Sequence, residues 1–169
     1  MKKLIMVNGT MGVGKSTVCN QLLKMLPRSV YLDGDWCWNM NPFVVSEETK
    51  EMVMDNITHL LRNYLQCSEY DYVIFCWVMQ EERIIEEVLR RLEGIELEVH
   101  KITLMITEKA LRDRLNKDIV RKIRTYDVIR RSVERLSLYE NMDTIKIDVS
   151  LKIPKQIAKE IIYHVNKVT

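Results

Sequence analysis

The stretch Leu4-Ile5-Met6-Val7-Asn8-Gly9-Thr10-Met11-Gly12-Val13-Gly14-Lys15-Ser16 decides how this 169-residue chain folds. It begins with four apolar residues, Leu4 to Val7, which are typical of a short strand buried on both faces. From Gly9 to Ser16 it fits the pattern G-x-x-x-x-G-K-[ST] at every fixed position. Apolar residues then recur at helical spacing until Pro27. The stretch therefore predicts a buried strand, a glycine-rich turn and a helix, in the order that the pattern requires.

The glycine-rich turn is suited to binding the phosphates of a nucleoside triphosphate. Glycines let the backbone curl so that successive N–H groups point at phosphate oxygens, and the helix N-terminus adds partial positive charge. Lys15 would reach the β- and γ-phosphates, Ser16 would hold Mg²⁺ through its hydroxyl, and Thr17 would support the α-phosphate. We therefore predict that ATP, arriving with Mg²⁺, is bound by Gly9, Thr10, Met11, Gly12, Val13, Gly14, Lys15, Ser16 and Thr17.

Length and composition indicate one domain outside the membrane. The length suits a single domain over residues 1–169, and 47% hydrophobic residues are enough to build its core. The 26 basic and 24 acidic residues nearly cancel, so no overall charge favours nucleic acid or an anionic membrane. The longest apolar run, Val73 to Met79, is too short to cross a bilayer, and the N-terminus does not read as a secretory signal. We expect a cytoplasmic monomer or homodimer.

The four cysteines carry no sign of a metal site. They stand at positions 19, 37, 67 and 76, with no Cys-x-x-Cys pair and no cluster with the three histidines. This spacing argues against zinc, and in a cytoplasmic protein we expect reduced thiols.

Strand-like and helix-like segments alternate along the rest of the chain. Short apolar runs predict strands at 30–32, 72–78, within 95–106 and at 145–149. Apolar residues at helical spacing predict the intervening helices at about 46–66, 84–92, 107–115, 125–139 and 154–168. This alternation predicts an α/β fold, with a parallel sheet covered by helices on both faces.

Two aspartates follow the second predicted strand, in Asp33-Gly34-Asp35. A phosphoryl-transfer enzyme needs a carboxylate near the acceptor hydroxyl and cations on the transferred group. Asp35 lies further from the strand and is our candidate for the catalytic carboxylate, which would orient or deprotonate that hydroxyl. Asp33 would reach Mg²⁺ through water. Because Gly and Asp are common in turns, a plain turn remains the alternative, and the sequence separates the two roles only weakly.

These features together resemble the small P-loop kinases of the P-loop NTPase superfamily, which include shikimate, gluconate, adenylylsulfate and nucleoside monophosphate kinases. The resemblance rests on Gly9 to Thr17, on Asp33-Gly34-Asp35 and on a basic segment at 109–135, in the family's order across most of the chain. It implies a three-layer α/β/α fold around a five-stranded parallel sheet of order 2-3-1-4-5. It also implies a small helical lid at about 117–126.

The basic segment supplies candidate residues for that lid. Residues 109–135 hold ten basic and four acidic side chains, and in the kinases that the chain resembles such a lid closes over the triphosphate. Arg121 and Arg124 are therefore candidate catalytic residues beside Lys15, and Arg114 resembles the arginine that packs against adenine. The arginine expected four positions after Arg114 is Asp118 here, so the usual lid pair is broken. For any single basic residue, a solvated helical face is the alternative.

The acceptor side departs from each named kinase. The third predicted strand ends without the triple glycine of shikimate kinase and without an Asp of Walker B type, although Cys76 weakly resembles gluconate kinase. Aromatic residues near the strand ends indicate an acceptor with an apolar or planar face, unless they only fill the core: Trp36, Trp38, Phe43 and Trp77.

We therefore expect an ATP-dependent phosphotransferase that moves the γ-phosphoryl group to a hydroxyl or phosphate of a small-molecule acceptor, such as a nucleotide, a sugar or an antibiotic-like compound. A polynucleotide 5′-kinase is one alternative, which the modest net charge and the lack of a basic tail disfavour. A regulatory NTP-binding switch is another. It would want a Walker B Asp and an Asn/Thr-Lys-x-Asp element, and the sequence shows neither.

Overall fold

One parallel sheet forms the centre of the protein. The structure is a computed structural model, and it describes residues 1–121 and 127–167. Over these residues, five strands form the sheet in the order β2-β3-β1-β4-β5. Their bounds are β1 Lys2–Asn8, β2 Ser29–Asp33, β3 Tyr72–Cys76, β4 Leu97–Met105 and β5 Ile145–Asp148. The order confirms the predicted sheet, with β1 in the middle.

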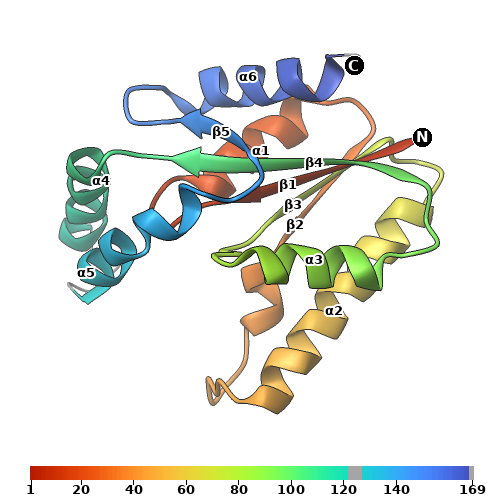
Figure 1. The fold of residues 1–169 in the computed structure, drawn as a ribbon, viewed down its shortest axis with the longest axis horizontal. Coiled ribbons are helices and arrows are strands. Elements are labelled where there is room, and N and C mark those ends of the chain that lie inside the picture. The colour runs from red at the N-terminus through yellow and green to blue at the C-terminus, as the bar shows by residue number, and fades with distance from the viewer. Residues whose placement is uncertain (122–126, 168–169) are drawn as a thin grey trace.

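Helices cover both faces of this sheet, as Figure 1 shows. On one face lie α1 (Lys15–Met25) and α6 (Pro154–Asn166), and on the other lie α2 (Glu47–Gln66) and α3 (Glu82–Arg91). Two further helices, α4 (Glu108–Val120) and α5 (Asp127–Glu134), stand beyond the carboxyl ends of the strands. The three-layer arrangement agrees with the prediction. Among the helices of residues 1–121 and 127–167, none combines the length and apolar character needed to cross a membrane.

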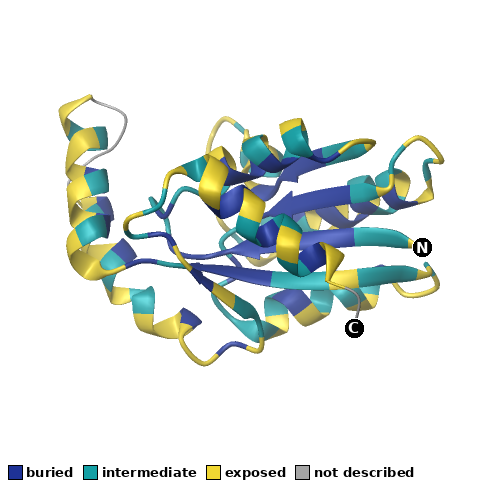
Figure 2. Cartoon of the chain, turned by 90° about the horizontal axis from the view of Figure 1, so that it is seen from above, coloured by how far each residue is buried: buried dark blue, intermediate teal, exposed yellow. Residues whose placement is uncertain are grey.

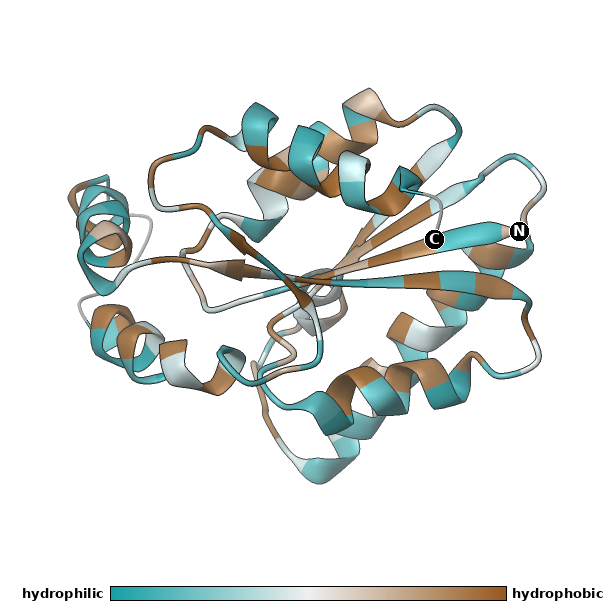
Figure 3. Ribbon diagram, turned by 45° about the horizontal axis from the view of Figure 1, so that its top comes forward, coloured by the Kyte–Doolittle hydropathy of each residue, from teal (hydrophilic) through white to brown (hydrophobic). Residues whose placement is uncertain are grey.

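The central strand β1 explains why the core has two halves. Ile5 and Val7 pack with the core that contains α1 and α6, and Leu4 and Met6 pack with the core that contains α2 and α3. Successive side chains of a strand point to opposite faces, so a strand covered on both sides needs a continuous apolar run. Figure 2 shows the buried residues along the strands, and Figure 3 shows that these are hydrophobic.

The helix starts follow local capping rules. Ser46 precedes α2, and its Oγ accepts a hydrogen bond from Thr49 N at 3.1 Å while Thr49 Oγ1 accepts one from Ser46 N at 2.8 Å. Thr107 caps α4 in the same way, since its Oγ1 accepts from Ala110 N at 3.3 Å. Side-chain oxygens of this kind satisfy N–H groups that the first turn leaves unpaired. Both predicted helix starts are confirmed.

Several predicted boundaries were wrong, and the helix predicted at about 107–115 continues to Val120 as α4. The strand predicted over 72–78 ends at Cys76, and the described part of the helix predicted over 125–139 breaks after Glu134, where a 3₁₀ helix, η2 (Leu136–Tyr139), follows. A single contact joins the two places, because the buried Tyr139 donates its hydroxyl to the Val78 carbonyl oxygen at 2.8 Å.

Candidate nucleotide-binding site

The loop between β1 and α1 requires glycine at two close approaches. Gly9 has φ of 140°, and a Cβ built there would lie 2.8 Å from the Leu104 carbonyl oxygen. Gly12 has φ of 84°, and its Cβ would lie 2.5 Å from a methyl carbon of Leu115 on α4. Backbone of this kind is open to glycine and strained for other residues. Gly9, the first fixed glycine of the motif, and Gly12, at one of its variable positions, therefore shape the loop and let α4 pack on it.

Lys15 lies over this loop at the start of α1. Its Nζ donates hydrogen bonds to the carbonyl oxygens of Gly9 at 2.9 Å and Thr10 at 3.1 Å. Burial lowers the pKa of the Lys15 ammonium, and the nearby carboxylates of Asp35 and Asp33 act in the opposite direction. Thr10 also donates from Oγ1 to the Ser132 carbonyl oxygen of α5 at 2.7 Å. These bonds hold the loop and its lysine in place.

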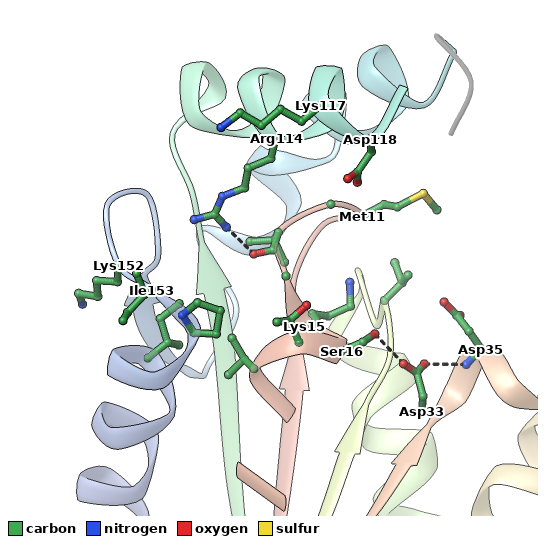
Figure 4. A pocket seen from close by; sticks show the side chains of 18 of the residues that line it. Met11, Lys15, Ser16, Asp33, Asp35, Arg114, Lys117, Asp118, Lys152 and Ile153 are labelled. Carbon is green, nitrogen blue, oxygen red and sulfur yellow. Dashed lines mark hydrogen bonds between the residues drawn. The ribbon is translucent and has the colours of Figure 1, made fainter. Parts of the chain in front are cut away.

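Ser16 and Asp33 form the oxygen-rich side of the site (Figure 4). Ser16 Oγ donates a hydrogen bond of 2.7 Å to Oδ2 of Asp33, the buried last residue of β2. The other oxygen, Oδ1, accepts from Asp35 N at 3.1 Å, which makes Asp33 the cap of a 3₁₀ helix, η1 (Gly34–Trp38). Hydroxyl and carboxylate oxygens are the ligands that Mg²⁺ prefers, so this pair fits a magnesium ion.

A pocket of about 510 Å³ opens above the loop. The loop and α1 line it from Met11 to Val18, Asp33 and Asp35 line one side, and Arg114, Lys117, Asp118 and Arg121 line another. Figure 4 shows Arg114, Lys117 and Asp118 on α4, across Lys15 from the two aspartates. Gly9 and Thr10 do not line the pocket, although they accept from Lys15. The pocket thus brings together most of the residues that the sequence suggested.

Arg114 joins the loop to the chain that follows β5. Its Nη1 donates to the Val13 carbonyl oxygen at 2.8 Å, and its Nη2 donates to the Val149 carbonyl oxygen at 2.5 Å. Burial lowers the pKa of the Arg114 guanidinium, and the charge of Asp148 acts against this. Lys152 and Ile153 also line the pocket, and Figure 4 shows them with Arg114 on the side of Lys15 away from Asp35.

The predicted lid is described only in part. Residues 117–120 belong to α4, and Arg121 follows at its C-terminus, exposed and lining the pocket. Arg124 lies outside the residues that the structure describes. Of the two predicted lid arginines, the structure therefore places Arg121 at the pocket.

Lys152 and Tyr31 are among the residues of the site that escaped the sequence reasoning. Lys152 lines the pocket and pairs with Glu160 at 2.6 Å. In the sequence, only its position just before the last helix could have indicated that it belongs to the site. Tyr31 donates its hydroxyl to Asp33 Oδ2 at 2.8 Å. A signal for Tyr31 did exist, because residues two apart on a strand point to the same face.

The fold and the loop define a class, that of P-loop nucleotide-binding proteins with the small-kinase arrangement of strands. The comparison with families agrees. A family described as an AAA domain matches residues 5–148, and the chain belongs to this family. No curated protein matches the chain in sequence.

Solved structures of similar fold cover nearly the whole chain. A tunicamycin resistance protein of Deinococcus radiodurans is 19% identical, with a TM-score of 0.69 and coverage of 99% of this chain and 98% of that one. A gluconokinase of Sinorhizobium meliloti is 16% identical, with a TM-score of 0.68 and coverage of 96% and 91%. An APS kinase of Mycobacterium tuberculosis, solved with AMPPNP and APS, is 15% identical, with a TM-score of 0.66 and coverage of 95% of both chains.

Proposed function

We propose that this protein is an ATP-dependent phosphotransferase that moves the γ-phosphoryl group to a hydroxyl or phosphate of a small-molecule acceptor. The observation that carries the proposal is one pocket in which a P-loop lysine, a Ser–Asp pair suited to Mg²⁺ and a second carboxylate meet. Phosphoryl transfer needs little more than such positioning and charge compensation. The fold neighbours described as gluconokinase and APS kinase support the same class of reaction.

Each group has a role in this proposal. The backbone N–H groups of Gly9 to Thr17 and the ammonium of Lys15 would bind the phosphates, and Arg114 would lie on the adenine side. Ser16 and Asp33 would hold Mg²⁺, which supplies charge neutralisation when it is bound. Asp35 would accept or orient the proton of the acceptor hydroxyl. Arg121 would compensate charge on the transferred group, a role that we also propose for Arg124.

Exposed aromatic rings in the segment that follows Asp35 support an acceptor with an apolar or planar face. The Trp36 side chain is 58% exposed and lies 5.3 Å from the Tyr31 ring between centroids, and Phe43 is 66% exposed and lies 5.9 Å from Trp38. Rings that only filled the core would be buried, so part of this group is available to a ligand. A nucleoside, sugar or antibiotic ring would suit them, and the neighbour described as a tunicamycin resistance protein is consistent with the last.

An acceptor screen tests the proposed function. The purified protein is incubated with ATP, Mg²⁺ and panels of nucleotides, sugars and antibiotics, and ADP release is followed together with the mass of each acceptor. We expect ADP release that depends on the acceptor, together with a phosphorylated product. Phosphorylation of a 5′-hydroxyl oligonucleotide alone would indicate the polynucleotide kinase instead, and nucleotide binding without any acceptor would indicate the switch.

A further inference from the structure

The carboxylate of Asp33 accepts hydrogen bonds from three donors. Oδ2 accepts from Ser16 Oγ at 2.7 Å and from Tyr31 OH at 2.8 Å, and Oδ1 accepts from the backbone N–H of Asp35 at 3.1 Å. Asp33 is 7% exposed and Tyr31 is 6% exposed, whereas Ser16 lies at the surface of the pocket. The exposed hydroxyl of Ser16 therefore bonds to the buried carboxylate of Asp33, which in turn bonds to the buried hydroxyl of Tyr31.

The directions of these bonds follow from the chemistry of the groups. A carboxylate only accepts, so the single hydroxyl proton of Tyr31 goes to Asp33. Cys76 Sγ lies 3.1 Å from the same hydroxyl oxygen, and its S–H is the group left to donate to it. The order of donation then runs from Cys76 to Tyr31 to Asp33.

The exposed hydroxyl of Ser16 can adopt more than one rotamer and can donate to more than one partner. A serine side chain has three staggered rotamers, and near water its proton finds several partners. Donation to Asp33 Oδ2 commits that proton and leaves the oxygen lone pairs for a cation. The position of Oδ2 therefore decides whether Ser16 is ready to bind Mg²⁺.

We propose that Tyr31 is a positioning residue of the magnesium site, where it holds Asp33 Oδ2 in the place from which that oxygen orients the hydroxyl of Ser16. The proposal rests on the proposed function of the pocket. Phosphoryl transfer itself would not involve Tyr31, because its hydroxyl is buried behind Asp33 and is not part of the pocket lining. Tyr31 would affect the affinity for the nucleotide only through the bound metal.

The test is calorimetric titration of ATP, with and without Mg²⁺, into the parent and Tyr31→Phe. Phenylalanine keeps the ring that packs against Trp36 and removes only the hydroxyl. We expect the factor by which Mg²⁺ strengthens ATP binding to fall about tenfold, the size of a lost hydrogen bond to a charged group, while the Kd without Mg²⁺ stays within about twofold. An equal loss in both conditions, or no loss, would overturn the proposal.

Two control variants separate positioning from general damage. Tyr72→Phe removes a hydroxyl that donates to Asn166 Oδ1 at 3.3 Å, at the end of β3 that pairs with Ser29 and not at the end that pairs with Asp33. Cys76→Ala removes the other partner of Tyr31 and leaves the bond from Tyr31 to Asp33. Both variants should keep the Mg²⁺ factor of the parent. A tenfold loss in either would count against a role for the Tyr31–Asp33 bond.

A double-mutant cycle shows whether Tyr31 acts through Asp33. If it does, adding Tyr31→Phe to Asp33→Ala lowers the Mg²⁺ factor no further, because alanine leaves no side-chain oxygen to accept the Tyr31 proton. Full additivity would overturn the proposal even if Tyr31→Phe alone is impaired. A parent protein that binds no ATP would instead refute the proposed function, so the two failures are distinguishable.

Discussion

Asp33, the last residue of β2, and Asp35, two residues later, differ in burial and contacts, and this difference predicts different roles. Asp33 is buried and accepts from Ser16, whereas Asp35 is exposed on the pocket wall. We expect Asp35→Asn to bind ATP with Mg²⁺ like the parent but to transfer the phosphoryl group about 10²–10⁴-fold more slowly, the usual range for a general base. Asp33→Asn should weaken the binding that depends on Mg²⁺.

Calorimetry beside a coupled turnover assay measures both effects. If Asp35→Asn turned over like the parent, the carboxylate role would belong to another residue, or the enzyme would work by positioning alone.

Gly12 lies under α4, and the prediction for it separates two costs of a side chain. Gly12→Ala would bring a methyl group to 2.5 Å from Leu115 at φ of 84°. Gly94→Ala is a matched control, because Gly94 has a similar φ of 88° and nothing within 4 Å of its Cβ position. We expect Gly94→Ala to lose about 1 kcal/mol of unfolding free energy and Gly12→Ala to lose more and to bind ATP poorly.

Urea unfolding and ATP titration check this pair. Equal losses of stability in the two variants would show that the contact between the loop and α4 has no energetic weight.

Among the elements, α2 and α3 are joined by Arg91. It pairs with Glu51 and Asp55 of α2 and with Glu87 on its own helix, and hydrogen bonds from Arg90 and Arg91 lower the pKa of Glu87 to about 2. Since the pKa is lower in the folded protein than its ordinary value of 4.5, Glu87 contributes stability above that value, and the contribution is lost as the pH falls toward 2.

The difference in unfolding midpoint between the parent and Glu87→Gln should therefore be largest near neutral pH and shrink between about pH 4.5 and pH 2. Thermal unfolding at a series of pH values measures it. Because these side chains lie at the surface, salt should reduce the difference. A difference that stays constant over this pH range would contradict the account.

The helices and strands also show which features can be predicted from residues close together in the sequence. The strand, loop and helix around Lys15 were predictable because glycines and the apolar run act over a few residues, and the capping residues Ser46 and Thr107 mark helix starts in the same way. The break after Glu134 was not predictable, because it accompanies a bond between Tyr139 and Val78, 61 positions apart.

In the candidate site, too, some features follow from local motifs and others depend on contacts between distant residues. The phosphate loop and the two aspartates follow from motifs, but Tyr31 meets Cys76 only because β2 and β3 pair with Asp33 opposite Cys76. Register between strands is a property of the folded sheet, and one sequence does not state it.

At the scale of the whole molecule, the sheet order places β1 in the middle. The loop that follows β1 therefore lies at the point from which the connecting helices go to opposite faces of the sheet. Ligands of open α/β sheets bind in this crevice, outside the carboxyl ends of the strands. Here α4 stands on one side of the pocket, and Asp35 of η1, followed by the exposed Trp36, stands on the other. In the function that we propose, the nucleotide would lie toward α4 and the acceptor toward the side of the pocket that Asp33 and Asp35 line.

The transfer of label from [γ-³²P]ATP to the best acceptor of the screen, by the parent and by Lys15→Ala, tests the central claim most directly. The Lys15 side chain lies over the loop and outside the two hydrophobic cores, so Lys15→Ala should fold with the circular dichroism spectrum of the parent. We predict labelled acceptor with the parent and none above background with the variant. Equal labelling by both proteins would contradict the assignment of this pocket as a phosphotransferase site.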